Sequence, residues 1–216
     1  MLQFSFWDIL SNLLVATQWT IVLSLIAFFF GGIVGLVLLF MRTSRIAPLE
    51  WFTKVYIEFF QGTPLLMQLF LFFFGIALFG VEVSPWTAAT LALTFWTSAF
   101  LTEIWRGCVE SIPKGQWEAS SSLALNYIEQ MRYVILPQAS RIAVAPTMGF
   151  SVQVIKGTAL ASIIGFVELT KAGTMLNNAT FRPFLVYSLV ALIYFCLCFP
   201  LSWWAKKIEG RLNVAR

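Results

Sequence analysis

Lys156 is the residue whose type and position most directly suggest chemistry, because the chain around it is largely apolar and otherwise uncharged over residues 142–166. A charged side chain inside a bilayer costs about 2.5–3.5 kcal/mol on insertion scales, so it requires a compensating interaction. An ammonium group there could bind the carboxylate of a substrate, or it could pair with a glutamate of another span. The adjacent Gly157 and Thr158 could loosen the helix and expose backbone groups to a ligand.

Glu103 and Arg106 are a second set of ionisable residues in an apolar stretch. Their spacing is that of an intrahelical ion pair, so they could form a structural pair or line a gate. Glu58 stands near the start of another apolar stretch and could simply be interfacial. With nearby amides and hydroxyls, these residues give eight candidate ligand-binding positions: Glu58, Gln61, Thr63, Gln68, Glu103, Gln153, Lys156 and Thr158.

Several common chemistries lack their residues in this sequence. Histidine is absent, which removes the commonest transition-metal ligand and the usual general base. Cys108, Cys196 and Cys198 are expected to be small hydrophobic residues rather than metal ligands or disulfide partners. No GxxxxGK[ST] phosphate-binding loop occurs. We therefore expect no metal site, no cofactor bound by this chain and no enzymatic activity of its own.

The composition is that of a membrane protein. Of the 216 residues, 59% are hydrophobic and 11% are charged, whereas a soluble domain has about 25% charged residues. The net charge of +4 is too small to suggest nucleic-acid binding. A spanning helix needs about 20 apolar residues, and the apolar stretches predict an all-α fold with five transmembrane helices in one domain, residues 1–216. The spans are placed at about residues 13–41, 52–79, 85–107, 140–166 and 184–206.

Two local features are predicted within these spans. Thr63 and Pro64 mark a kink in the second span, because proline cannot donate a helical hydrogen bond. Gly31 and Gly35 form a GxxxG pair in the first span, where missing side chains let another helix approach closely.

The basic residues predict the orientation of the chain. With the N-terminus outside and the C-terminus in the cytoplasm, only Lys171 and Arg182 lie on the outer side. The inner side then collects the remaining basic residues outside the spans or at their ends: Arg42, Arg45, Lys54, Arg106, Lys114, Arg132, Arg141, Lys206, Lys207, Arg211 and Arg216. This bias follows the positive-inside rule.

A polar segment, residues 111–141, separates the third and fourth spans and is then cytoplasmic. It predicts a short helix over about residues 115–127, with Gly115 as the N-cap. The negative charge of Glu118 would stabilise the first turn, because the N-terminus of a helix carries partial positive charge. From Gln116 onward the pattern is helical, and seven residues at helical spacing fall on one side. Pro137 is expected to end this helical segment. The stripe consists of Trp117, Ser120, Ser121, Ala124, Ile128, Met131 and Ile135.

This helix could lie on lipid or bind a protein. A lipid-bound helix would favour a polar face rich in lysine and arginine. The segment does not provide such a face, because it places two acidic residues, Glu118 and Glu129, beside one basic residue, Arg132. A protein partner is therefore the favoured interpretation.

The segment resembles the EAA loop of ABC importer permeases. The resemblance is carried by Glu118-Ala119-Ser120, Ala124 and Val134-Ile135-Leu136-Pro137, where the family pattern has Glu-Ala-Ala, a glycine and Ile-x-Leu-Pro. Further motifs resemble the permeases that import polar amino acids, the histidine, glutamate, glutamine and arginine class. They are FQGTPLL at 60–66 followed by Gln68, EIWRG at 103–107, SIPKGQWEA at 111–119, ILPQA at 135–139 and KGTAL at 156–160. The chain departs from that class at Gln61, usually arginine, and at Gly157, usually aspartate.

The resemblance implies a permease subunit of a type I importer in the bacterial inner (cytoplasmic) membrane. It implies a dimer with a second permease, the same or a sister chain, and a periplasmic solute-binding protein that delivers a polar amino acid. ATP and Mg would be bound by separate ATPase subunits, which would grip the cytoplasmic coupling helix. The implied coupling residues are Gly115, Trp117, Glu118, Ala119, Ser120, Leu123, Ala124, Leu136 and Pro137.

Two other classes of protein compete with this interpretation. A stand-alone secondary transporter or channel would need no ATPase, but the absence of an inverted repeat and the partner-binding helix argue against it. A membrane enzyme or assembly scaffold is a third class, and the sequence lacks the histidines, cysteine cluster and clustered carboxylates that an enzyme would use.

Overall fold

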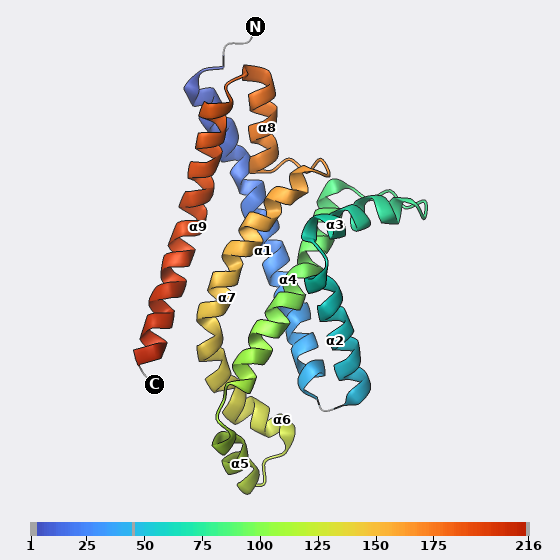
Figure 1. Ribbon diagram of the computed structural model, residues 1–216, viewed down its shortest axis with the longest axis vertical. Coiled ribbons are helices and arrows are strands. Elements are labelled where there is room, and N and C mark those ends of the chain that lie inside the picture. The colour runs from blue at the N-terminus through green and yellow to red at the C-terminus, as the bar shows by residue number, and fades with distance from the viewer. Residues whose placement is uncertain (1–3, 45, 215–216) are drawn as a thin grey trace.

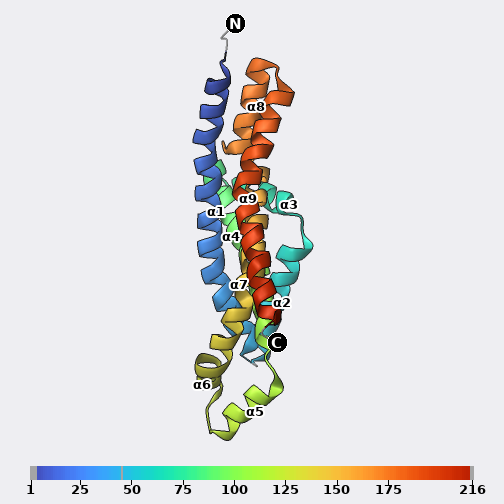
Figure 2. The same cartoon turned by 90° about the vertical axis from the view of Figure 1, so that its left-hand side faces the viewer.

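The computed structural model describes residues 4–44 and 46–214, and this part of the chain is helical, without strands. Two long helices, α1 (Phe6–Thr43) and α9 (Pro183–Val214), run along the length of the molecule (Figure 1). α4 (Pro85–Glu110) and α7 (Leu136–Thr158) cross beside them. α8 (Leu169–Thr180) lies at one end of the molecule and α5 (Lys114–Ser122) at the other (Figures 1 and 2).

The predicted second span is sharply bent. α2 (Ala47–Gly62) ends before Thr63, and α3 (Leu65–Phe70) continues into a π-helical turn, η1 (Leu71–Gly75), at 103° to α2. Pro64 lacks an N–H and biases Thr63 towards extended backbone, and Thr63 has ψ 141°. The predicted kink is therefore confirmed, and it divides the predicted span 52–79 into two helices.

The fourth span ends earlier than the sequence predicts. α7 stops at Thr158, and a short 3-10 helix, η3 (Ala159–Ser162), leads to a turn at Gly165. At its other end, α7 continues directly from α6 (Tyr127–Glu129) and a π-helical segment, η2 (Gln130–Ile135). The observed helix over 136–158 thus begins and ends earlier in the chain than the predicted span 140–166.

Close packing of α1 on α4 depends on the two glycines of the first predicted span. A Cβ at Gly31 would lie 2.7 Å from Cγ2 of Thr97, and one at Gly35 would lie 3.2 Å from the carbonyl oxygen of Ser98. The predicted close helix approach at this GxxxG pair is confirmed, with α4 as the neighbour.

Three buried clusters hold the helices together. The largest joins α1, α3, α4 and the end of α7 around Leu23, Leu69, Leu93 and Phe150. A second joins the first turns of α1 to α8 and α9, and a third joins the ends of α4 and η2. The third cluster anchors the segment that carries α5.

Among the described helices, α1 and α9 are long and apolar enough to cross a membrane, and the bent α2–α3 pair would make a third span if counted as one. α4 and α7 have 26 and 23 residues, but they are less apolar. α4 carries Glu103, Arg106 and Glu110, and α7 carries Arg141 and Lys156.

Candidate functional site

The polar segment folds into two helices joined by a tight turn. α5 ends at Ser122, and Ala124 adopts left-handed backbone with φ 57°. The N–H of Ala124 donates to Ser121 O at 2.9 Å, and that of Leu125 donates to Ser120 O at 3.3 Å. Because side chains disfavour left-handed backbone, this position suits glycine, the residue that the EAA pattern has here.

Two predicted helix boundaries are wrong. Pro113, rather than Gly115, is the N-cap of α5, so Gly115 lies inside the first turn. Pro137 was expected to end the segment but lies in the first turn of α7, which continues from η2. Pro137 follows a π-helical segment in which Leu136 N–H bonds to Met131 O, five residues back, so the usual hydrogen-bond pattern is already interrupted there and the helix continues past the proline.

The predicted stripe does not form one exposed face. Trp117 packs on the buried cluster at the ends of α4 and η2, which includes Met131 and Ile135. Ser120 is buried, and its hydroxyl donates to Trp117 O at 2.9 Å. The turn at Ala124 breaks the helical period, so residues 117–120 and 128–135 belong to different helices.

The free surface of α5 is therefore the other side of the helix. Leu123 is 74% exposed. Of the remaining predicted coupling residues, Gly115, Glu118, Ala119, Ala124 and Pro137 are exposed, and Leu136 is half-buried.

Gln130 fixes α5 to the next helix, a role that the sequence interpretation missed. Its side-chain Nε2 donates to Ser121 Oγ at 3.0 Å and to Leu125 O at 2.8 Å. Gln138 adds a second link, because its Nε2 donates to Gln116 Oε1 at 3.1 Å. Side-chain hydrogen bonds thus connect α5 and the turn after it to η2 and α7.

Gln68 holds the break between α2 and α3. The side chain is 2% exposed, and its Nε2 lies 2.9 Å from Phe60 O, 3.1 Å from Thr63 O and 2.9 Å from Thr63 Oγ1. The amide thus satisfies carbonyl groups that the broken helix leaves without N–H partners. Two predicted pathway residues, Thr63 and Gln68, are brought together here, in a structural role.

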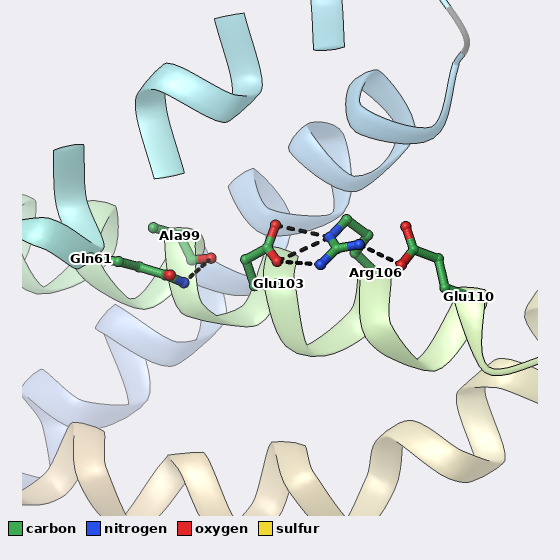
Figure 3. Close-up of polar contacts among 5 residues, drawn as sticks. All are labelled: Gln61, Ala99, Glu103, Arg106 and Glu110. Atoms are coloured by element: carbon green, nitrogen blue, oxygen red, sulfur yellow. Dashed lines mark hydrogen bonds and ion pairs between the residues drawn. The ribbon is translucent and has the colours of Figure 1, made fainter. Parts of the chain in front are cut away.

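The predicted ion pair on α4 is confirmed and extended (Figure 3). Arg106 Nε lies 3.0 Å from both carboxylate oxygens of Glu103, Arg106 Nη2 lies 2.7 Å from Glu103 Oε2, and Nη1 donates to Glu110. Gln61 of α2 donates to Ala99 O at 3.2 Å, one turn before Glu103 on the same face of α4. Glu58 is exposed beside Lys54, at 3.8 Å.

The polar residues at the end of α7 face different neighbours. Thr158 is buried and donates to Ile155 O at 2.7 Å. A Cβ at Gly157 would lie 3.2 Å from Leu65 and 3.4 Å from Leu93, so this side of α7 packs on α3 and α4.

Lys156 instead lines a groove of about 330 Å³ against α9, with Tyr194, Cys198 and Ser202. The ion pairs formed by the described residues do not include Lys156, and Gln153 is exposed. Lys156 thus faces α9. The other predicted pathway residues Gln61 and Gln68 instead form hydrogen bonds with residues of α2 and α4.

Glu168 is a buried acid that the sequence analysis did not single out. It is fully buried and caps α8, with Oε1 accepting the N–H of Lys171 at 2.9 Å. Its Oε2 accepts hydrogen bonds from Tyr194 at 2.8 Å and from Thr20 at 3.3 Å. In the sequence, Glu168 stands directly before a polar helical segment. This pattern predicts a helix cap but does not indicate that the acid is buried.

Residues 27–214 match the family of binding-protein-dependent transport system inner membrane components. The chain belongs to this family. It is 37% identical to the L-cystine transport system permease protein TcyB of Bacillus subtilis, over 99% of this chain and 90% of that protein. It is 32% identical to the glutamine transport system permease protein GlnP of Escherichia coli K12, over 96% of each.

Solved structures agree with the family membership. One chain of an amino acid ABC transporter, crystallised with histidines, superposes with a TM-score of 0.89 at 31% identity, covering 97% of this chain and all of that one. A chain of the MetNI methionine ABC transporter in an inward-facing conformation has a TM-score of 0.74 at 21% identity, covering 92% and 95% of the two chains. The second similarity is one of fold.

Proposed function

We propose that this permease-family chain is the transmembrane subunit of an ATP-driven importer of polar amino acids. The observation that carries the proposal is helix α5, which lies at the end of the molecule opposite α8 (Figure 1). Glu118 and Ala119 on this helix are exposed, as is Leu123 at its C-cap. The names of the relatives support the amino-acid class, since they include cystine and glutamine permeases.

The proposed topology has five spans, with the N-terminus outside and the C-terminus in the cytoplasm. α1, the bent α2–α3 unit, α4, α7 and α9 would be the spans, and the bacterial inner membrane would be the location. The opposite ends occupied by α8 and α5 support this arrangement (Figure 1). The positive-inside distribution of basic residues gives the direction.

The proposed partners are two ATPase subunits, a second permease and a periplasmic solute-binding protein. ATP and Mg would be bound by the ATPase subunits. Closure of these subunits around ATP would move α5, and the Gln130 and Gln138 hydrogen bonds would transmit that movement to η2 and α7.

Site-specific photo-crosslinking tests this partner assignment in the membrane-embedded complex. A photoreactive residue at Leu123 is expected to crosslink to the ATPase subunit, because this side chain is 74% exposed. The same residue at Phe181, which is 85% exposed beyond α8, serves as the control and should not reach the ATPase. Crosslinks from Leu123 to lipid alone would overturn the coupling role of α5.

For the substrate pathway, we propose that Lys156 interacts with the carboxylate of the amino acid. Its absence from the ion pairs of the described residues and its position at the end of α7 support this role. The Lys156→Ala variant should lose amino-acid-stimulated transport while the complex still assembles, whereas Lys171→Ala in α8 should retain it. Normal uptake by Lys156→Ala would contradict the assignment.

A stand-alone secondary transporter is the competing function. It would move its substrate without an ATPase, so uptake by the purified chain alone in liposomes would favour it.

A further inference from the structure

An apolar groove of about 500 Å³ lies between α1, α4 and α7. Figure 1 shows that α5 follows the end of α4 that contributes to this lining. Most of its lining is hydrocarbon, for example Leu36, Leu39, Val109, Ala143 and Met148. The two hydroxyl groups in the lining are already engaged. Ser140 donates to Pro137 O at 3.2 Å, and Thr147 accepts the Trp105 indole N–H at 2.9 Å.

The rim of this groove is exposed and apolar. Leu36 of α1 and Val144 of α7 are 45% and 43% exposed. A water molecule in the groove would find few hydrogen-bond partners, since a stably bound water needs two to four polar groups. In a bilayer, a groove of this character is suited to hydrocarbon.

Two arginines stand beside the groove on its helices. Arg42 follows the lining residue Leu39 by one turn of α1, and Arg141 precedes the lining residue Val144 by one turn of α7. Arg42 Nε is buried without a hydrogen-bond partner in the described part of the chain. The ion pairs that the described residues form include neither arginine. Both positions fall at the predicted boundary between membrane and cytoplasm.

We propose that this groove binds an anionic phospholipid of the cytoplasmic leaflet. One acyl chain would fill the groove, and the phosphate would accept hydrogen bonds from Arg42 and Arg141. Basic pockets between transmembrane helices on the cytoplasmic side bind anionic head groups in this way. A guanidinium group suits the role because its planar donors match phosphate oxygens. Charge complementarity thus favours an anionic lipid over a zwitterionic one.

Native mass spectrometry of the complex, purified from bilayers of mixed phosphatidylglycerol and phosphatidylethanolamine, tests the proposal. The wild-type complex should retain phosphatidylglycerol. The double variant Arg42→Gln/Arg141→Gln should retain about thirtyfold less, given the attraction contributed by each of the two basic residues. Arg182→Gln, at the other end of the molecule, is the matched charge control and should leave retention unchanged.

A second variant tests the groove itself. Val144→Trp places a large side chain at the exposed rim, where folding should tolerate it, and should displace the lipid while circular dichroism stays unchanged. Equal retention of both lipids, or unchanged retention in the double arginine variant or in Val144→Trp, would overturn the proposal. A crosslink from Val144 to a second permease instead of lipid would also overturn it.

Discussion

The hydroxyl of Tyr194 in α9 lies 2.8 Å from the carboxylate of Glu168, which is fully buried at the start of α8. The same carboxylate accepts a hydrogen bond from Thr20 of α1, so one acid joins three helices. Thr20 in turn accepts the N–H of Leu169 at 3.2 Å. This network, together with the apolar cluster beside it, fixes α8 between α1 and α9.

Removing the Tyr194 hydroxyl should therefore destabilise this end of the molecule. Tyr194→Phe leaves a buried carboxylate oxygen with one donor fewer, and such losses cost about 1–3 kcal/mol. We expect a lower midpoint of thermal unfolding for the detergent-solubilised complex. Tyr187→Phe on the same helix is the matched control, because Tyr187 is 42% exposed and its change should have little effect. Equal midpoints for the two variants would show that the hydrogen bond does not stabilise the fold.

Replacing alanine by glycine should have opposite effects on stability at Ala124, which has left-handed backbone, and at Ala119, which lies inside α5. Ala124→Gly should relieve backbone strain of about 1 kcal/mol, since its φ is 57°. Ala119→Gly, inside α5, should weaken the helix by about 1 kcal/mol because glycine is a poor helix former. Amide hydrogen exchange over residues 114–126 should slow in the first variant and quicken in the second. Faster exchange in Ala124→Gly would contradict the strained turn.

The contact between α1 and α4 can be tested with two neighbouring glycines. Gly31→Ala would place a methyl group 2.7 Å from Thr97, so α1 and α4 would have to separate, at a cost of about 1–3 kcal/mol. Gly32→Ala has its nearest neighbour, Trp105, at 3.8 Å and should be tolerated. Thermal unfolding of the two variants should differ in midpoint by several degrees. A similar midpoint for both would mean that the helices have room to adjust.

Features that depend on local spacing were predictable from the sequence. The GxxxG contact, the Thr63–Pro64 kink and the Glu103–Arg106 ion pair each follow from residues close together in the chain. The EAA-like motif likewise indicated the family before any tertiary contact was known.

Features that depend on tertiary contacts were not predictable. The inward packing of Trp117 and Ser120 requires the cluster formed by Met131 and Ile135, which belongs to another helix. The stripe at helical spacing therefore suggested one continuous face. Similarly, the role of Glu168 depends on Tyr194, which belongs to another helix and which the residues next to Glu168 do not specify.

The central claim, that this permease moves amino acids with energy from a separate ATPase, is tested most directly by uptake in proteoliposomes. Vesicles would contain the chain alone or with its ATPase subunits, and they would be given labelled polar amino acids, the solute-binding protein and ATP. The account predicts accumulation only when the ATPase and ATP are both present. Equal uptake by the chain alone would contradict it.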